Sequence, residues 1–246
     1  MLPNFGLTSV VIGPIHLYWW GFFVAIGIGA TLVIAEWESK KNKLSFDHIM
    51  DVTVWTVVAA LLGSRIMHVV FYEPAFYAAH PLEILQVWHG GMSSTGGIVL
   101  GTIAAIFYVL KKKLNIRAYG DVIARALPAA WFIGRLGCFF THTHPGTLSN
   151  MPWAIKYPDG GRLELSILEA AVWAIIGAIL WLIPRPKKTG MYLVYVALLY
   201  APMRFMLDFL RAEDVRYAGL TPAQYVMIGL CAVGLFGYFR FKKYDA

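Results

Sequence analysis

Four arginines lie inside or at the edges of apolar stretches, where a permanent charge needs a partner. Arg135 lies within the apolar segment 129–140, and Arg65, Arg204 and Arg211 lie near the edges of other such segments. A guanidinium keeps its proton at any accessible pH, so water, a carboxylate or an anionic ligand must meet its charge. We therefore expect some of these arginines to bind something negatively charged.

A polar stripe accompanies Arg204. Tyr200, Arg204, Asp208 and Arg211 are spaced by four, four and three residues, so in a helix they share one face. Two interpretations are open: an intrahelical ion pair between Arg204 and Asp208, or the wall of a polar cleft that receives a lipid headgroup. We favour the cleft, with Glu169 in another apolar stretch as a second acidic candidate.

The segment 138–144 carries three chemically versatile side chains: Cys138, His142 and His144. The His-x-His spacing is compatible with a metal site, and a Cys–His pair is compatible with nucleophilic chemistry. A histidine acid–base or hydrogen-bonding role, or inert interfacial histidines, are the other interpretations. We favour the acid–base role and assign no metal. Further imidazoles are available at His68 and His89.

Two glycine motifs accompany these residues. Gly134 and Gly137 bracket Arg135, and close helix packing through glycine does not by itself explain the arginine between them. Gly96 and Gly97 follow a glycine-rich polar stretch at the entry of a predicted helix, where exposed N–H groups can hold a phosphate. The alternative for this second motif is a turn followed by close packing.

Composition sets the class of protein. The chain is 59% hydrophobic and 14% charged, with a mean hydropathy of +0.61, which excludes an ordinary soluble domain. Several apolar runs reach the roughly 20 residues that cross a bilayer. The first run lacks a small-residue cleavage site and is predicted to be a retained helix. We predict an all-α integral membrane protein with spans at 15–36, 50–72, 95–111, 119–141, 165–184, 190–208 and 222–241.

The basic residues orient these spans. Clusters follow the first, third, fifth and seventh spans, at 40–43, 111–117, 185–188 and 240–243. Because cytoplasmic loops are rich in lysine and arginine, the N-terminus is predicted to be periplasmic and the C-terminus cytoplasmic. The clusters are not part of a nucleic-acid-binding motif, so the net charge of +7 indicates no nucleic-acid partner. The two cysteines give no disulfide framework.

The predicted organisation is one polytopic membrane domain over 1–246. Its longest periplasmic loop is 142–164, and the periplasmic loops are expected to form a small head. The unusual polar residues fall on this side, so a site would open outward. The chain has no internal repeat, which disfavours an inverted-repeat transporter.

Taken in order, these segments resemble the bacterial prolipoprotein diacylglyceryl transferases. The resemblance implies a seven-helix inner-membrane enzyme that moves diacylglyceryl from phosphatidylglycerol to the thiol of a lipoprotein-signal cysteine, without a metal or other cofactor. The segments that carry it are 17–21, 63–66 with 71–72, 87–93 with 96–97, 134–137, 152–154 with 157–158, Glu169, Gly190 and 200–211.

The chain departs from the family pattern at several polar positions. Thr95 stands where the family has histidine, and Cys138 stands where it has asparagine. An Asn-Gly-Glu run is replaced by Thr141, His142 and Thr143. Three further departures are Trp20 for a tyrosine, Asp208 for a glutamate, and a His-Pro-Ser-Gln-Leu-Tyr-Glu stretch that survives only as Arg162 and Glu169.

Thr95 cannot accept a proton as imidazole does, so the hypothesis is that His89, His142 or His144 has taken over as general base. Arg135 and Arg204 are predicted to hold the lipid phosphate. The predicted binding site is completed by Arg65, Tyr200, Glu169, Asp208, Arg211, Gly96, Gly97, Gly134, Gly137 and Cys138. Two rival functions stay open: a divergent paralogue, for example a histidine-ligated metal enzyme, and a non-catalytic phospholipid-binding membrane protein.

Overall fold

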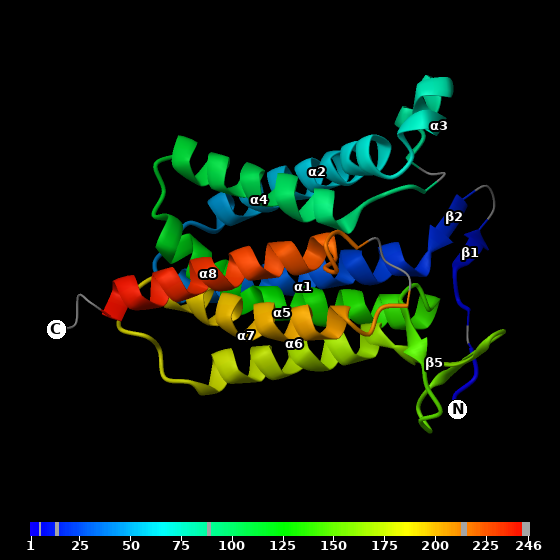
Figure 1. Ribbon diagram of the computed structural model, residues 1–246. Helices are drawn as coiled ribbons and strands as arrows, with labels where there is room; N and C mark the ends of the chain where they lie inside the picture. Colours follow the sequence, from blue (N-terminus) through cyan, green and yellow to red (C-terminus); the bar gives the residue numbers. More distant parts are fainter. Residues whose placement is uncertain (5, 13–14, 88–89, 213–215, 243–246) are drawn as a thin grey trace. The chain divides into compact units, whose positions relative to one another are not determined.

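A computed structural model describes residues 1–4, 6–12, 15–87, 90–212 and 216–242. Within this part, seven helices are long and apolar enough to span a membrane. This confirms the predicted all-α membrane fold. The seven are α1 (Trp19–Lys41), α2 (Phe46–Phe71), α4 (Ser94–Lys111), α5 (Ile116–Thr141), α6 (Leu165–Leu182), α7 (Met191–Asp208) and α8 (Pro222–Lys242) (Figure 1).

The first helix corrects the predicted span 15–36 at both ends. Strand β2 (Ile15–Tyr18) pairs antiparallel with β1 (Ser9–Ile12), so residues 15–18 satisfy their backbone groups in a hairpin and the helix begins at Trp19. At the other end α1 continues to Lys41. Glu38 is buried there and accepts a 2.7 Å hydrogen bond from Arg125 Nη1. The helix therefore extends past the predicted end because this buried ion pair meets the charge of Glu38.

The chain divides into two compact units. One comprises residues 1–42 and 120–246, and the other residues 43–119. The expectation of a single domain over the whole chain stays a prediction. The second unit contains α2, α4 and, between them, the short helices α3 (Pro74–Ala79) and η1 (Pro81–Leu85).

Helices α2 and α4 pack closely through glycine. A Cβ on Gly97 would lie 2.5 Å from Ser64 Oγ, and one on Gly96 would collide with the backbone of Gly63. Both glycines are buried in the first turn of α4. Their clearest role is therefore the close packing of two membrane helices.

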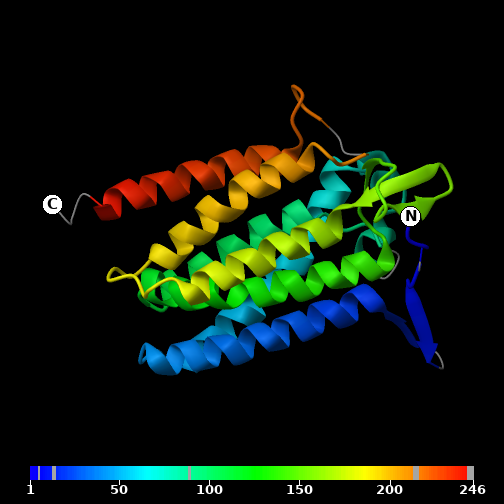
Figure 2. The ribbon, with the colours of Figure 1, turned by 90° about the horizontal axis from the view of Figure 1, so that it is seen from below.

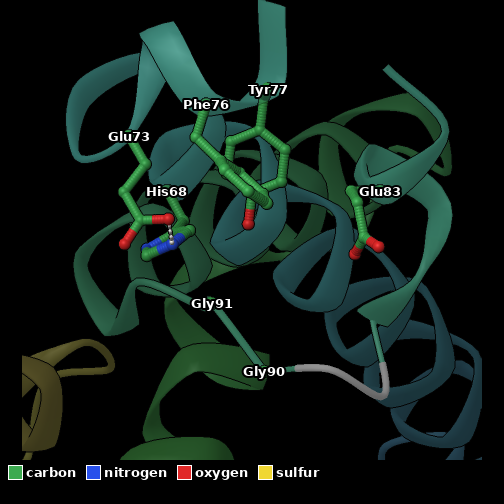
Figure 3. Close-up of a pocket in the computed structure, with 7 residues that line it drawn as sticks. All are labelled: His68, Glu73, Phe76, Tyr77, Glu83, Gly90 and Gly91. Atoms are coloured by element: carbon green, nitrogen blue, oxygen red, sulfur yellow. Dashed lines mark ion pairs between the residues drawn. The ribbon is translucent and has the colours of Figure 1, made fainter. Parts of the chain in front are cut away.

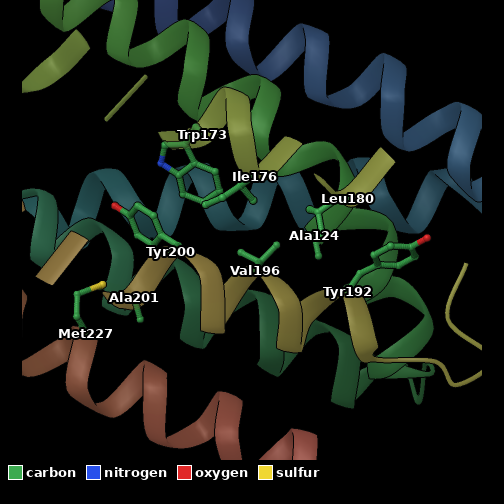
Figure 4. Packing of buried hydrophobic residues seen from close by; sticks show 9 residues of the cluster. All are labelled: Ala124, Trp173, Ile176, Leu180, Tyr192, Val196, Tyr200, Ala201 and Met227. Carbon is green, nitrogen blue, oxygen red and sulfur yellow. The ribbon is translucent and has the colours of Figure 1, made fainter. Parts of the chain in front are cut away.

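The first unit has an interior formed mainly by α5, α6 and α7, with α8 lying alongside α7 (Figures 1 and 2). The N-terminus of α7 is fixed from α5. Asp121 accepts hydrogen bonds from the backbone N–H of Gly190 (2.6 Å) and of Tyr192 (2.9 Å). Gly190 has the left-handed φ of 96° that glycine adopts without strain. The buried cluster consists of Ala124, Trp173, Ile176, Leu180, Tyr192, Val196, Tyr200, Ala201 and Met227 (Figure 4).

The predicted loop 142–164 folds into a small antiparallel sheet. Its strands β3 (Pro145–Leu148), β4 (Ile155–Tyr157) and β5 (Gly160–Glu164) have the order β3-β5-β4. The chain start joins β4, because Leu2 N donates to Ala154 O at 2.8 Å. The residues after α7 join β3, since Thr147 N donates to Leu210 O at 2.8 Å. The sheet thus ties three distant segments together at the end of the first unit where α5 and α7 finish and α6 begins.

Candidate active site

One buried carboxylate links two arginines from different helices. Glu169 on α6 is only 2% exposed; its Oε2 lies 2.6 Å from Arg135 Nε on α5, and its Oε1 lies 2.9 Å from Arg204 Nε on α7. Two guanidinium groups therefore share one carboxylate. A cluster that combines excess positive charge with burial is well suited to an anionic ligand.

The cluster continues along the predicted polar stripe of α7. Asp208 Oδ1 lies 2.9 Å from Arg204 Nη2 and 3.4 Å from Arg211 Nε. The Thr221 hydroxyl, at the start of α8, donates a hydrogen bond to Asp208. The ion pair of one sequence interpretation is therefore present. It is also one part of a network that extends through Glu169 to Arg135, and the cleft interpretation stays a prediction.

Thr221 belongs to a capping box that joins α8 to α7. Thr221 N donates to Gln224 Oε1 at 2.9 Å, and Gln224 N donates back to Thr221 Oγ1 at 3.2 Å. Gln224 Nε2 also donates to Phe205 O at 3.1 Å. Sequence reasoning missed both residues, although a threonine followed three positions later by glutamine before an apolar run is a helix-start signal.

Aromatic rings pack beneath the arginine pair. Trp131 and Trp173 stack with their ring centroids 5.6 Å apart, and Tyr200 lies 4.5 Å from Trp173. The Arg135 guanidinium lies 5.5 Å from the Trp131 ring centroid. A guanidinium over an indole gains a cation–π interaction and keeps a fixed orientation.

His144 lies in the electrostatic field of the same arginines. Burial, together with the positive charges of Arg135, Arg211 and Arg204, lowers the pKa of His144 to about 3. The imidazole is therefore neutral at physiological pH. It can exchange hydrogen bonds with a ligand, but a group that releases its proton so readily is a poor general base.

His142 occupies a different environment just beyond the end of α5. Its Nδ1 lies 3.3 Å from Glu164 Oε2, and both side chains are buried. The Tyr157 hydroxyl donates to the same carboxylate oxygen at 3.2 Å. Burial raises the pKa of the Glu164 carboxyl, and hydrogen bonds from Ser166 and His142 partly oppose that rise. Glu164 was not among the predicted residues, because nothing in local spacing links it to His142.

The remaining predicted residues of the first unit lie along α5. Gly134 faces open space, whereas a Cβ on Gly137 would lie 2.6 Å from Phe23 Cβ. Cys138 is buried and free. Gly137 thus allows close packing between α5 and α1, whereas a Cβ at Gly134 would meet no neighbour.

Arg65 lies in the second unit and is used locally. Its Nε donates to Ile84 O at 3.0 Å, and its Nη1 donates to Gly91 O at 2.9 Å and to Gly90 O. It thereby holds the segment after α3 against α2. This segment borders a cavity of about 440 Å³ lined by His68, Glu73, Phe76, Tyr77, Glu83, Gly90 and Gly91 (Figure 3). His89, one of the proposed bases, lies outside the described residues.

The described residues contain no group of three or more histidine, cysteine, aspartate or glutamate side chains that could hold a metal ion. A second ionic cluster that sequence reasoning missed lies elsewhere in the first unit, where Glu38 pairs with Arg125 at 2.7 Å and with Arg185 at 3.2 Å. A charged Arg125 within an apolar span was the available signal.

These features define a multi-pass membrane protein with a buried arginine–carboxylate network at one end of its larger unit. Residues 8–240 match the model of the prolipoprotein diacylglyceryl transferase family, and the chain belongs to that family. It is accordingly a transferase.

Three relatives illustrate the similarity, each named phosphatidylglycerol–prolipoprotein diacylglyceryl transferase. The protein from Nitratidesulfovibrio vulgaris is 29% identical over 253 residues, covering 95% of this chain and 92% of the relative. The one from Chromohalobacter salexigens is 29% identical, covering 95% and 91%. The one from Pseudomonas paraeruginosa is 30% identical, covering 95% and 92%.

Proposed function

We propose that this protein transfers diacylglyceryl from phosphatidylglycerol to the cysteine thiol of a prolipoprotein. The names of relatives that match nearly the whole chain support both substrates. In this reaction a thiolate sulfur bonds to the glyceryl carbon while the bond from that carbon to the phosphate oxygen breaks. The electron pair leaves with glycerol phosphate, and the thiol proton passes to a base.

The observation that carries the proposal is the sharing of Glu169 by Arg135 and Arg204. The departing phosphate gains a negative charge as the carbon–oxygen bond breaks. Two fixed guanidinium groups with one carboxylate between them can stabilise that charge without reorganisation. Arg135 and Arg204 are the residues proposed to hold the phosphate and lower the barrier.

The neighbouring residues are given supporting roles. Asp208 and Arg211 orient Arg204. Tyr200 packs against the Trp173 ring, with the two ring centroids 4.5 Å apart. Gly134, Gly137 and Cys138, on the same helix as Arg135, stay predicted substrate contacts. Among the three proposed bases, the low pKa of His144 disfavours it.

Three candidate residues, Arg65, Gly96 and Gly97, lie in the second unit. Arg65 is proposed to act by fixing residues 83–86 and 90–91, because its guanidinium donates to backbone carbonyls in both segments. Gly96 and Gly97 stay predicted substrate contacts.

The proposed location is the inner membrane of a bacterium, with the arginine network on the periplasmic side. The four basic clusters at alternate connections support this orientation. The N-terminus and the sheet 145–164 lie at one end of the first unit, and the C-terminal end of α8 lies at the other (Figure 2).

The test uses purified protein in bilayer nanodiscs of stated lipid composition. With phosphatidylglycerol present, a synthetic peptide bearing the lipoprotein-signal cysteine should gain one diacylglyceryl group by mass spectrometry, whereas phosphatidylethanolamine nanodiscs should give no product. R135Q and R204Q should each reduce turnover by about 100-fold or more, since each removes a charge that stabilises the leaving phosphate. Unchanged affinity for phosphatidylglycerol in the double variant would contradict the assignment.

Membership of a transferase family argues against the non-catalytic phospholipid-binding protein of the sequence analysis, and one observation in favour of that rival calls for a test. Thr95 stands where the family resemblance leads one to expect histidine. The same nanodisc assay separates the two functions: phosphatidylglycerol binding that depends on Arg135, with no peptide product, would identify the binding protein.

A further inference from the structure

His142 adopts a backbone conformation that rarely carries a side chain. Its φ is +49°, in the left-handed region. Its N–H donates to Phe139 O at 3.3 Å, and the next N–H, of Thr143, donates to Cys138 O at 3.4 Å. This pair of hydrogen bonds is a Schellman motif, in which glycine is the usual residue at the position of His142. An imidazole is therefore held where the backbone alone favours no side chain, and such conformations cluster at functional sites.

The strained position places the imidazole on a buried carboxylate. His142 Nδ1 lies 3.3 Å from Glu164 Oε2, and the two side chains are 3% and 1% exposed. The opposite carboxylate oxygen of Glu164 accepts from the Ser166 hydroxyl at 2.9 Å. A carboxylate fixed in this way sets the tautomer of its histidine, because only Nδ1 can donate to it and the basic lone pair is then on Nε2.

This histidine–carboxylate pair and the arginine network join the same two helices. Arg135 and Glu169 connect α5 to α6, and His142 and Glu164 connect the end of α5 to the start of α6. His142 lies about two helical turns, or roughly 10 Å, beyond Arg135. The thiol attacks the glyceryl carbon that carries the phosphate oxygen, so sulfur and phosphate lie on opposite sides of that one carbon. The long Arg135 side chain that holds the phosphate and the imidazole that contacts the thiol span the rest of this distance.

We infer that His142, oriented by Glu164, is the base that accepts the thiol proton in this protein. This inference rests on the proposed function. The thiol proton moves to the imidazole, the resulting thiolate bonds to the glyceryl carbon, and glycerol phosphate leaves with the electron pair. The imidazolium, stabilised by the Glu164 carboxylate, then releases the proton to water. Glu164 acts through His142 and is a positioning residue.

The other groups around His142 fit this division of roles. Tyr157 donates its hydroxyl hydrogen to Glu164, which strengthens the carboxylate's fixed orientation. Phe139 lies edge-on to the imidazole at 5.8 Å, so the ring has an apolar neighbour on one side. Both contacts restrict the imidazole to one orientation.

The decisive variant is H142G, because the two possible roles of His142 predict opposite results. Glycine relieves the left-handed backbone, and this gain offsets the lost hydrogen bond to Glu164, so the melting temperature should stay close to that of the wild type. Turnover should nevertheless fall by about 100-fold or more, the usual contribution of a general base. Added imidazole should restore part of the turnover by entering the vacated space, and it should not restore R135Q.

A matched control is available at the end of α4. Lys113 has a φ of +53°, and the N–H groups of Lys113 and Leu114 donate to Leu110 O and Val109 O in the same Schellman pattern. K113G should therefore gain the same backbone relief and leave turnover unchanged. E164Q should lower kcat while leaving the KM for phosphatidylglycerol unchanged, and adding E164Q to H142G should cause little further loss.

The outcomes separate this inference from the proposed function. Wild-type protein that makes no product would overturn the proposed function, and the inference with it. Wild-type activity together with an H142G variant that retains turnover within about threefold would overturn the inference alone. If H142G is inactive and also melts at a clearly lower temperature, the loss of turnover has a structural explanation and a second variant must decide. H142N, in which asparagine tolerates the same backbone, then serves as the second test: turnover near wild type would overturn the inference.

Discussion

The arginine network predicts an unusual response to the loss of Glu169. In E169Q the shape of the side chain is kept while the charge that Arg135 and Arg204 share is removed. Two guanidinium groups held on one carboxylate lie about 5–6 Å apart, and at an effective dielectric constant of about 20 their repulsion is roughly 3 kcal/mol. Removing one partner from a buried ion pair typically costs about 3–5 kcal/mol, which agrees with that value.

We therefore expect E169Q to melt about 6–12 °C below the wild type in nanodiscs of neutral lipid. Phosphatidylglycerol should restore much of this loss, because its phosphodiester supplies the missing anion to the two arginines. The lipid-dependent increase in melting temperature should accordingly be larger for E169Q than for the wild type. Differential scanning fluorimetry across a series of phosphatidylglycerol fractions measures this increase.

The chain offers a matched control in Glu38, a buried carboxylate that also contacts two arginines, Arg125 and Arg185. E38Q should be destabilised, although by less, because Arg185 is about half exposed and water screens its charge. Phosphatidylglycerol should give E38Q no extra protection over the wild type. Equal lipid protection in E169Q, E38Q and the wild type would refute the assignment of the arginine pair to the phosphate.

Three further predictions concern contacts within the first unit. T221V should lower kcat about 10-fold, because Asp208 loses a hydrogen bond that helps to fix Arg204, and T221S should retain activity. The pKa of His144 is lowered from 6.5 to about 3, so between these pH values the unfolded chain binds a proton that the folded protein does not. The free energy of unfolding should therefore fall as the pH falls from 6.5 toward 3. H144Q should flatten this acid side of a profile of melting temperature against pH. D121A should lower the free energy of unfolding by about 1 kcal/mol, because the Gly190 N–H loses its acceptor. Amide hydrogen exchange should become faster at the start of α7.

The sequence predicted the seven helices because the pattern that indicates each helix lies within one short segment. A membrane span is a continuous apolar run, so the seven helices follow from hydropathy. The stripe from Tyr200 to Asp208 follows from the helical repeat, but Arg211, predicted to belong to it, lies beyond the end of α7. The start of α1 was predicted wrongly, because residues 15–18 are apolar enough to extend the span, and only their pairing with 9–12 makes them a strand.

Contacts between helices could not be predicted from spacing. Glu169 was a candidate by type, but its position between Arg135 and Arg204 depends on how α5, α6 and α7 pack. Glu164 and Glu38 were missed for the same reason: each pairs with a residue from a separate helix or its end. For Glu169, Glu164 and Glu38, therefore, only the folded arrangement identifies the partner.

The position of His142 suggests why an imidazole could be introduced there. A helix end that needs a left-handed residue accepts a side chain other than glycine at about 1 kcal/mol, without disturbing the packing of the helix before it. The same imidazole placed on a buried face of α5 would displace neighbouring side chains at a larger cost. The hydrogen bond to Glu164 offsets that small strain. A catalytic base can therefore be gained at this position by one substitution, provided that a carboxylate lies opposite, as Glu164 does.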